Sequence, residues 1–342
     1  MSESLKQELA HYLTVAGLSQ VSEIASLTQG LSNRNYYVRG VHASKDYESE
    51  WVLRLNSWAS TQICDRPSEV AAWVDASEAG LAPNIVYISP QKDFYLSQFL
   101  AQNDNRSWSV LNSANGSHPI SNVAESWPKA EQLLLQLLDG LKRLPLPKNV
   151  ITVEQQWQTY YSRLSQMQQQ LRFQQSSSSA SLAAWLQQFD LLHAQEDAVT
   201  AMLCLHERCL VKNQFSHRDL NPFNILLVQD KLNCIDFEYA CSSHPLCDLA
   251  SVISSHSLSS KQRKWLIESY LNNQINLNHH AQDAIPAAVD LYWVFAVCWA
   301  LQMAFDSMTL DGKLNADTDK IKQAESYLDC ARQYQTLIGS CS

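Results

Sequence analysis

The residues that could do chemistry gather in two short segments, HRDLNPFNILL at 217–227 and CIDFEYA at 234–240. Both place aspartates beside apolar, strand-like runs, where an unpaired carboxylate is costly. Asn224 follows Asp219 by five residues, and Asp236 follows it by seventeen. This spacing suits transfer of a γ-phosphoryl group from ATP to a hydroxyl, in which the first Asp takes the acceptor's proton while the Asn and the second Asp hold Mg²⁺. The alternative is that these are capping or turn residues of an ordinary α/β protein.

The same chemistry requires further residues upstream, and the sequence supplies candidates in the expected order. A basic residue on the third strand should pair with a glutamate on the following helix. WVLRLN offers Arg54, and RPSEVAAW offers Glu69 fifteen residues later. A turn over the phosphates is expected between the first two strands, and TQGLSNRN places Gly30, Ser32 and Asn33 there. Taken singly, Arg54 and Glu69 would be read as solvated surface residues.

The elements that must position these residues follow from hydrophobic periodicity. The first hundred residues predict a helix at 3–14 and then a β-β-β-α-β-β order, with the helix at 65–81 opened by Pro67 and closed by Gly80. From about residue 104 the pattern is helical, apart from a polar stretch at 174–181 and the short strands around the two motifs. The sequence therefore predicts an α+β protein with a strand-rich part followed by a helix-rich part.

Several segments resemble the superfamily of aminoglycoside phosphotransferases and choline kinases, most closely its choline, ethanolamine and thiamine kinase branch. The resemblance spans nearly the whole chain, with few specific matches between residues 100 and 200. It rests on these segments: GLSNRNYYV, VLRLN, RPSEVAAWVDASEAGLAPNIVY, HRDLNPFNILL and IDFEYACSSHPLCDLASVI. It implies a bilobal, protein-kinase-like fold with ATP bound between an N-terminal lobe at 1–98 and a C-terminal lobe at 104–342, joined by a hinge at 99–103.

The resemblance also implies roles for single residues. Asp219 would be the catalytic base, Asn224 and Asp236 would hold Mg²⁺, and Arg54 would contact the ATP phosphates and pair with Glu69. In the segment SQFLAQ (97–102), Gln98 and its neighbours would receive adenine through their backbone. His217 would be structural, bonding backbone near Asp236, and Asp248 would brace the catalytic loop.

Departures from the protein-kinase pattern point away from a protein substrate. Arg54 stands where those enzymes have Lys, and Glu238 stands where they have the Gly of D-F-G. No A-P-E segment follows Asp236. Glu238 is a candidate for an additional contact near the metal.

The acceptor pocket is expected in the helical part, where a cation would be held by aromatic faces and a carboxylate. Tyr292, Phe295, Trp299 and Asp306 share one helical face, and Tyr239 follows the second motif. The alternative is that this aromatic stripe packs the core. The segment resembles the W-x-x-W-x-x-x-Q helix of choline kinases, but Phe295 and Cys298 replace the two Trp residues, which leaves thiamine as an equal candidate beside choline and ethanolamine.

Composition limits which partners and which cellular location we expect for the protein. A formal charge of −9 without a Lys/Arg cluster excludes nucleic acid as a partner and tolerates a cationic small molecule. The nine scattered cysteines, the absence of a signal-like start and the lack of an uninterrupted apolar run of membrane-spanning length predict a cytoplasmic protein that does not insert into membranes. Two other functions compete with a kinase of a small alcohol: an antibiotic-modifying phosphotransferase of aminoglycoside type, and a catalytically idle, kinase-fold binding protein.

Overall fold

The computed structural model describes residues 3–27, 33–57, 64–102, 107–112, 127–173, 180–310, 313–314 and 317–339. The chain forms two compact units. Unit 1 comprises residues 1–112, 132–149 and 215–242, and unit 2 comprises residues 113–131, 150–214 and 243–342. The predicted lobes and hinge stay a prediction, because unit 1 draws on segments from both sides of the expected boundary.

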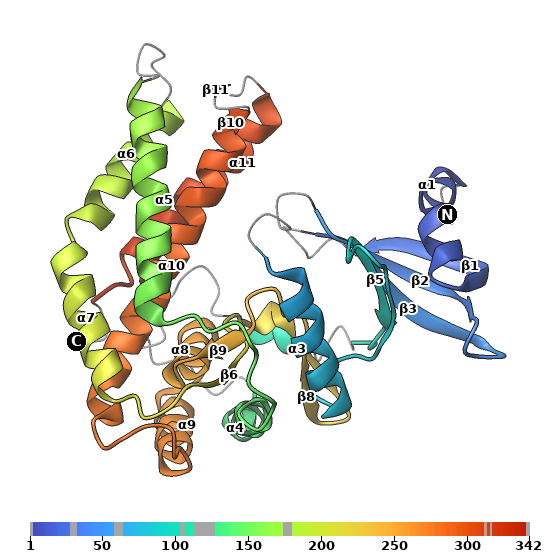
Figure 1. Ribbon diagram of the computed structural model, residues 1–342, viewed down its shortest axis with the longest axis horizontal. Coiled ribbons are helices and arrows are strands. Elements are labelled where there is room, and N and C mark those ends of the chain that lie inside the picture. Colours follow the sequence, from blue (N-terminus) through green and yellow to red (C-terminus); the bar gives the residue numbers. More distant parts are fainter. Residues whose placement is uncertain are drawn as a thin grey trace. The chain divides into compact units, whose positions relative to one another are not determined.

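A five-stranded antiparallel sheet in the order β1-β2-β3-β5-β4 dominates unit 1 (Figure 1). Its elements and the flanking helices are α1 (Glu3–Val15), β1 (Leu18–Leu27), β2 (Arg34–His42), β3 (Glu48–Leu55), α3 (Arg66–Glu78), β4 (Ile85–Ile88) and β5 (Phe94–Gln98). The predicted β-β-β-α-β-β order is therefore present, and the predicted α+β fold class is confirmed.

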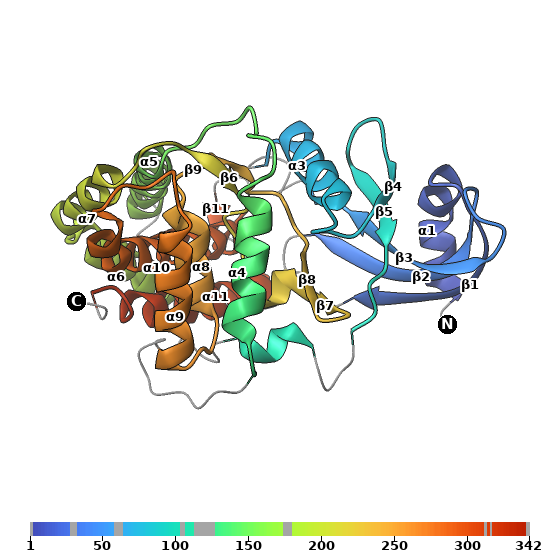
Figure 2. The ribbon, with the colours of Figure 1, turned by 90° about the horizontal axis from the view of Figure 1, so that it is seen from below.

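Strand alternation gives β3 two different faces. Trp51, Leu53 and Leu55 are buried in an apolar cluster that includes Leu9 and Leu13 of α1. Figure 2 shows α1 lying against this sheet. The residues that alternate with Trp51, Leu53 and Leu55 along β3 project to the opposite face of the sheet, where α3 lies. Helix α1 thus covers the apolar face of the sheet, and the second face is left for polar chemistry.

The rest of unit 1 consists of short elements that carry the two motifs. Strand β6 (Gln214–Ser216) pairs with β9 (Cys241–Ser243), and β7 (Ile225–Val228) forms a hairpin with β8 (Lys231–Cys234). Two 3₁₀ turns, η1 (Trp108–Leu111) and η3 (Pro222–Asn224), and most of helix α4 (Ala130–Leu141) complete the unit. The HRDLNPFN segment runs from β6 through η3 into β7, so strands fix both of its ends.

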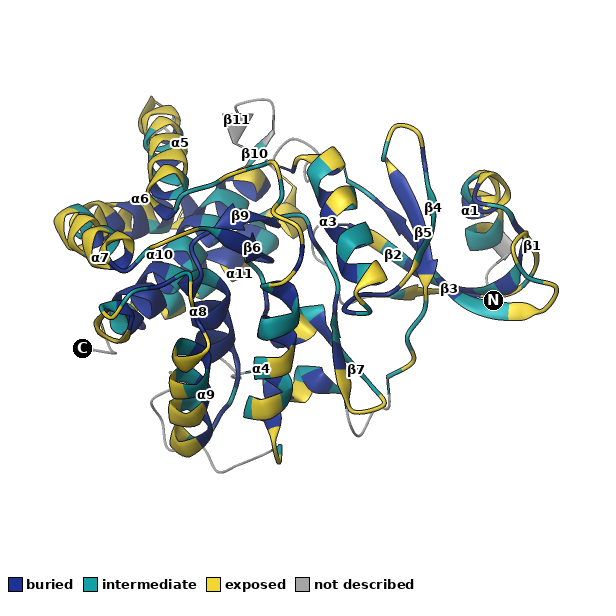
Figure 3. Ribbon diagram, turned by 60° about the horizontal axis from the view of Figure 1, so that its bottom comes forward, coloured by how far each residue is buried: buried dark blue, intermediate teal, exposed yellow. Residues whose placement is uncertain are grey.

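Unit 2 is built almost entirely of helices. Its elements are α5 (Val153–Phe173), α6 (Ala180–His193), α7 (Glu196–Arg208), α8 (Leu246–Ser255), α9 (Ser260–Asn272), α10 (Ala281–Met308), α11 (Thr318–Gln335) and the two-stranded pair β10 (Thr309–Leu310) and β11 (Lys313–Leu314). Helix α10 contacts α5, α6, α7, α8 and α11. Figure 3 shows α7 and α9 with one buried and one exposed face, whereas α8 is buried nearly all round.

Helix α10 is long and apolar enough to cross a membrane, since an 18-residue window within it has a mean hydropathy of 1.7. The expectation that the chain has no uninterrupted apolar run of this length is unaffected. Uninterrupted apolar runs in α10 are short, because polar residues such as Asp290 and Gln302 divide them. However, 72% of the window is buried inside the structure. That burial is typical of a core helix.

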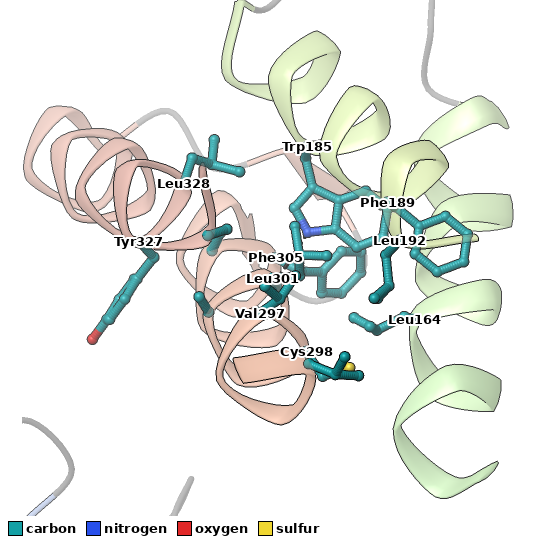
Figure 4. Packing of buried hydrophobic residues seen from close by; sticks show 14 of the residues in the cluster. Leu164, Trp185, Phe189, Leu192, Val297, Cys298, Leu301, Phe305, Tyr327 and Leu328 are labelled. Atoms are coloured by element: carbon teal, nitrogen blue, oxygen red, sulfur yellow. Dashed lines mark hydrogen bonds between the residues drawn. The ribbon is translucent and has the colours of Figure 1, made fainter. Parts of the chain in front are cut away.

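The core of unit 2 is centred on Trp185, which is fully buried (Figure 4). Its indole stacks on Phe189 with ring centroids 5.6 Å apart, and its Nε1–H donates to the backbone carbonyl of Leu301 at 2.7 Å. One side chain therefore joins α6 to α10 by both packing and a hydrogen bond.

Replacing Trp185 by Ala is expected to lower the free energy of unfolding by about 3–5 kcal/mol, because a large cavity opens and the Leu301 carbonyl loses the donor that it has outside its own helix. Chemical denaturation followed by circular dichroism measures this. The exposed Trp265 of α9 provides the matched control, since Trp265→Ala should change stability by less than about 0.5 kcal/mol. Equal effects of the two substitutions would contradict the central place of Trp185.

Candidate active site

Strand β3 and helix α3 bring Arg54 and Glu69 together on the polar face of the sheet. Arg54 Nη2 lies 2.9 Å from Glu69 Oε1, and the exposed fractions of the two side chains are 7% and 0%. A buried ion pair stabilises only when both charges are satisfied, and loss of one partner is costly. The order strand, basic residue, helix, glutamate thus produces a buried ion pair, and the alternative of two solvated surface residues is wrong.

The guanidinium of Arg54 has further partners within unit 1. Its Nη1 lies 3.0 Å from Asp236 Oδ1, its Nε–H donates to Asn56 Oδ1 at 3.0 Å, and Nη2 lies 3.7 Å from Glu238 Oε2. Burial alone would lower the pKa of Arg54, but the three carboxylates more than offset this and raise it. One planar cation therefore links the helix glutamate to the second motif, a task suited to the fork geometry of Arg.

Glu238 is buried among charged groups. Burial, and then the Asp236 carboxylate, raise the pKa of Glu238, while Arg54 opposes the shift. Asn33 directs its Nδ2 toward Glu238 Oε2 at 3.5 Å and accepts a hydrogen bond from the backbone N–H of Ser57 through Oδ1. Asn33 thus connects the start of β2 to the end of β3 and to the second motif.

Two amides fix the Asp219 carboxylate. Asn221 Nδ2 donates to Oδ1 at 2.8 Å, and Asn224 Nδ2 donates to Oδ2 at 2.7 Å. Asn221 also caps η3, since its Oδ1 accepts from the backbone N–H of Phe223. Burial raises the pKa of Asp219, and the Asn221 bond opposes this rise. A carboxylate with a raised pKa is a stronger proton acceptor.

His217 forms hydrogen bonds to the backbone of both motifs. Its Nε2–H donates to the backbone carbonyl of Ile235 at 3.1 Å, its Nδ1 accepts from the backbone N–H of Asp219 at 3.4 Å, and its ring lies 4.8 Å from that of Phe237.

Asp236 has a φ of 67°, in the left-handed region. Such a conformation costs on the order of 1 kcal/mol in a non-glycine residue and persists only where its surroundings impose it. The carboxylate of Asp236 is thereby aimed at Arg54.

Only some of the other residues predicted to contact the nucleotide lie in the part of the chain that the structure describes. Gly30 and Ser32 lie outside the described residues. Gln98 is exposed at the end of β5. Its backbone N–H donates to the backbone carbonyl of Asn84, and the backbone N–H of Phe99 donates to the backbone carbonyl of Glu50. A backbone N–H that donates to adenine in this segment would therefore have to come after Phe99, and the predicted contact at Gln98 stays a prediction.

The predicted acceptor residues fall into both units. Tyr239 and Glu238 belong to unit 1, whereas Tyr292, Phe295, Trp299 and Asp306 lie on α10 in unit 2. Asp248 is buried in the first turn of α8, also in unit 2, and its bracing role stays a prediction.

Three residues of the site escaped the sequence analysis: Asn56, Arg66 and Asn221. Asn56 lies two residues after Arg54, and Asn221 lies two residues after Asp219. The only indication in the sequence was that Asn56 and Asn221 lie close to motif residues. The direction in which each side-chain amide points depends on the folded backbone, so spacing alone could not assign these two residues to the site. Arg66 is the first residue of α3, and its Nη1 lies 2.6 Å from Glu69 Oε2.

The comparison with protein families agrees with this geometry. The model of the phosphotransferase enzyme family matches residues 23–281, more than half of the chain. The chain belongs to this family. This confirms the predicted enzyme class, a small-molecule phosphotransferase with an alcohol group as acceptor.

Known proteins similar to this chain have related descriptions. Protein LicA of Haemophilus influenzae (strain ATCC 51907 / DSM 11121 / KW20 / Rd) is 25% identical over 237 residues, covering 68% of this chain and 76% of LicA. Choline kinase LicA from Streptococcus pneumoniae has a TM-score of 0.58 at 13% identity, over 96% of this chain and 98% of its own. ADP-bound aminoglycoside phosphotransferase APH(2'')-Ib has a TM-score of 0.54 at 12% identity, over 99% and 100%. The fold is therefore shared by choline kinases and aminoglycoside phosphotransferases, as the sequence resemblance implied.

Proposed function

We propose that this phosphotransferase is an ATP-dependent kinase acting on the hydroxyl of a small cationic alcohol of choline or ethanolamine type. The observation that carries the proposal is the pair of polar clusters that unit 1 builds around its two motifs. In one, Asp219 is held by two amides, and in the other, Arg54 joins Glu69 to Asp236. An idle binding protein would have no need of so many buried charges in one place.

In the proposed reaction the oxygen of the acceptor hydroxyl forms a bond to the γ-phosphorus of ATP. The bond from that phosphorus to the bridging oxygen breaks, and ADP leaves with the electron pair. Asp219 accepts the proton of the hydroxyl, and burial, by raising the pKa of Asp219, makes its carboxylate a stronger proton acceptor. The bonds from Asn221 and Asn224 hold the carboxylate in one orientation.

The residues present fit a magnesium ion. Asn224 uses its Nδ2 toward Asp219, so its Oδ1 is the atom left to bind a cation, and Asp236 supplies a carboxylate with a side chain 27% exposed. Within the residues that the structure describes, no group of three or more His, Cys, Asp or Glu could hold a metal. A pair of oxygen ligands is what Mg²⁺ uses when water and phosphate complete its shell. When bound, Mg²⁺ would neutralise charge on the phosphates.

The nucleotide proposal is supported by two features. One structure with the same fold holds ADP. In this chain, Gln102 accepts a hydrogen bond from the backbone N–H of Leu227 in β7 and donates to the backbone carbonyls of Leu100 and Ala101. The Gln102 side chain therefore holds the segment after β5 against β7, the strand that follows Asn224. A backbone contact to adenine near Leu100 would require this segment to be held in place.

The acceptor's cation is proposed to bind at the aromatic face of α10. The Phe295 ring lies 6.2 Å from Tyr160 of α5, and Trp299 packs edge-on against Tyr327 of α11 at 5.5 Å. Phe295 and Trp299 are half-buried, and Asp306, on the same face, is exposed. Figure 4 shows the Tyr327 hydroxyl pointing away from the packed core. The choline kinase among the similar structures favours choline-type acceptors over thiamine.

Trp299→Leu is expected to raise KM for the cationic acceptor about 2- to 30-fold, because a leucine keeps apolar volume but has no π face for the cation. KM for ATP should stay unchanged. Steady-state kinetics with each substrate varied in turn measures both values. The control is Trp265→Leu on α9, for which neither KM should move. An unchanged acceptor KM in the Trp299 variant would mean that the stripe only packs the core.

The proposed function is tested by ADP release from Mg·ATP with single acceptors: choline, ethanolamine, thiamine, homoserine and gentamicin. Turnover on choline or ethanolamine that Asp219→Asn abolishes would support the proposal. Turnover on gentamicin alone would assign the chain to antibiotic modification, and turnover on thiamine alone would overturn the acceptor assignment. Nucleotide binding without turnover on any of them would favour the idle binding protein.

A further inference from the structure

Arg66 occupies a position that is unfavourable for its charge. It is the first residue of α3, directly after the N-cap Asp65, where the positive end of the helix dipole disfavours a cation. Its side chain is only 5% exposed, so the guanidinium also loses most of its contact with water. A buried cation in such a place needs a compensating partner, and Glu69, three residues later, provides it at 2.6 Å.

Glu69 is divided between two arginines. Its Oε1 faces Arg54 Nη2 at 2.9 Å, and its Oε2 faces Arg66 Nη1 at 2.6 Å. The Tyr95 hydroxyl also donates to Oε2 at 3.3 Å, and the Cys64 thiol lies 3.8 Å from the same atom. Since the side chain of Glu69 is fully buried, its carboxylate has no contact with bulk water and depends on these protein partners. The direction of Oε1 toward Arg54 is therefore set by what holds Oε2.

The balance of charge around Arg54 also indicates that Glu69 needs its second arginine, Arg66. Arg54 faces three carboxylates, those of Glu69, Asp236 and Glu238. Without Arg66, one guanidinium would have to compensate all three in a region of low dielectric. A released Glu69 could then turn away, and Arg54 would shift toward Asp236 and Glu238. The position of Arg54 at the second motif thus depends on a residue outside both motifs.

We propose that Arg66 is a positioning residue for phosphoryl transfer, which holds the Glu69 carboxylate so that Glu69 in turn holds Arg54. The inference rests on the proposed ATP-dependent function and adds a residue to its machinery. Arg66 touches neither nucleotide nor acceptor in this scheme. Its effect reaches the phosphates only through Glu69 and Arg54.

The test compares Arg66→Met, which keeps the apolar stem, with Arg66→Lys, which keeps the charge. Arg66→Met should lower kcat/KM for ATP at least about tenfold, because displacement of a positioning group is costly even without direct contact. It should also weaken binding of a non-hydrolysable ATP analogue, measured by calorimetry without any acceptor. Arg66→Lys should recover part of both losses, since an ammonium can reach Oε2 but cannot reproduce the guanidinium geometry. Arg34→Met, which breaks an exposed ion pair to Glu8, is the matched control and should change neither value.

A purely structural role of Arg66 gives a different result. Arg66→Met would then lower the melting temperature while kcat, KM for ATP and analogue affinity of the folded protein stayed at wild-type values, which would overturn the proposal. A double-mutant cycle with Glu69→Gln adds a second criterion. The two effects on kcat/KM should be strongly non-additive, and additive effects would contradict the chain of contacts. If the wild-type protein turned over no acceptor, the proposed function would fail, whereas analogue binding would still decide the role of Arg66.

Discussion

Replacing Asp219 by Asn is expected to lower kcat about 10²- to 10⁴-fold while Mg·ATP still binds. An amide has nearly the shape of the carboxylate but cannot take the acceptor's proton. The change also alters the local bonds, because Asn221 and Asn224 both donate to Asp219. An Asn at 219 offers only one side-chain oxygen, so one of the two amides loses its side-chain acceptor at this residue, although Asn224 also donates to the backbone carbonyl of residue 219. Steady-state kinetics, together with analogue binding by calorimetry, separates the loss of chemistry from a loss of nucleotide affinity.

The control for Asp219→Asn is the same substitution at Asp190, an exposed residue of α6, which should leave kcat unchanged. Asn221→Ala distinguishes orientation from proton transfer. It removes one donor to Asp219 and the cap of η3 but leaves the base in place, so its effect on kcat should be clearly smaller. Near wild-type activity of Asp219→Asn would show that another group takes the proton.

The parts of the site that sequence reasoning predicted are those that local patterns determine. Alternation along β3 places Arg54 on the face opposite Leu53 whatever the rest of the fold does. The short span from Asp219 to Asn224 closes through a single 3₁₀ turn. These relations involve neighbours along the chain, so residue type and spacing carry most of the information.

Side-chain direction and helix ends were harder to predict. Nothing in the spacing shows that Arg66 turns inward to Glu69, because an arginine at a helix start is usually solvated. The helical pattern after the polar stretch at 174–181 also does not show that the structure divides this region into α6 and α7 at Ala194 and Gln195. The acidic pair Glu196 and Asp197 at the start of α7 suits a new helix N-terminus.

The aromatic stripe of α10 shows a third limit. The helix is apolar nearly all round, so its sequence cannot distinguish a face that packs the core from a face that lines a pocket. Phe295 and Cys298 both align with Trp positions of choline kinases, yet Cys298 is fully buried in the unit 2 core while Phe295 is half-buried. A Trp at position 298 would overfill that core, and the departure from the choline kinase pattern therefore has a packing reason as well as a consequence for binding.

Replacing Arg54 by Lys is expected to lower kcat/KM for ATP about 10²-fold, although the positive charge is kept. The guanidinium reaches Asn56, Asp236 and Glu69 from three different nitrogens. A lysine ammonium is a single point that cannot serve all three at once. The carboxylate that is left out would be Glu69 or Asp236, and either loss disconnects the helix glutamate from the second motif. Kinetics with ATP as the varied substrate measures the effect.

Two comparisons make the Arg54 prediction specific. Arg39→Lys affects an ion pair to Glu50 in which both side chains are substantially exposed, and it should leave kcat/KM unchanged. Arg54→Met removes the charge altogether and leaves buried Glu69 without one of its two arginines. That variant should lose about 3–5 kcal/mol of unfolding free energy in addition to activity, whereas Arg54→Lys should lose much less. Wild-type kinetics of Arg54→Lys would mean that the site uses only the charge at this position, and the directed bonds of the guanidinium would then have no part in catalysis.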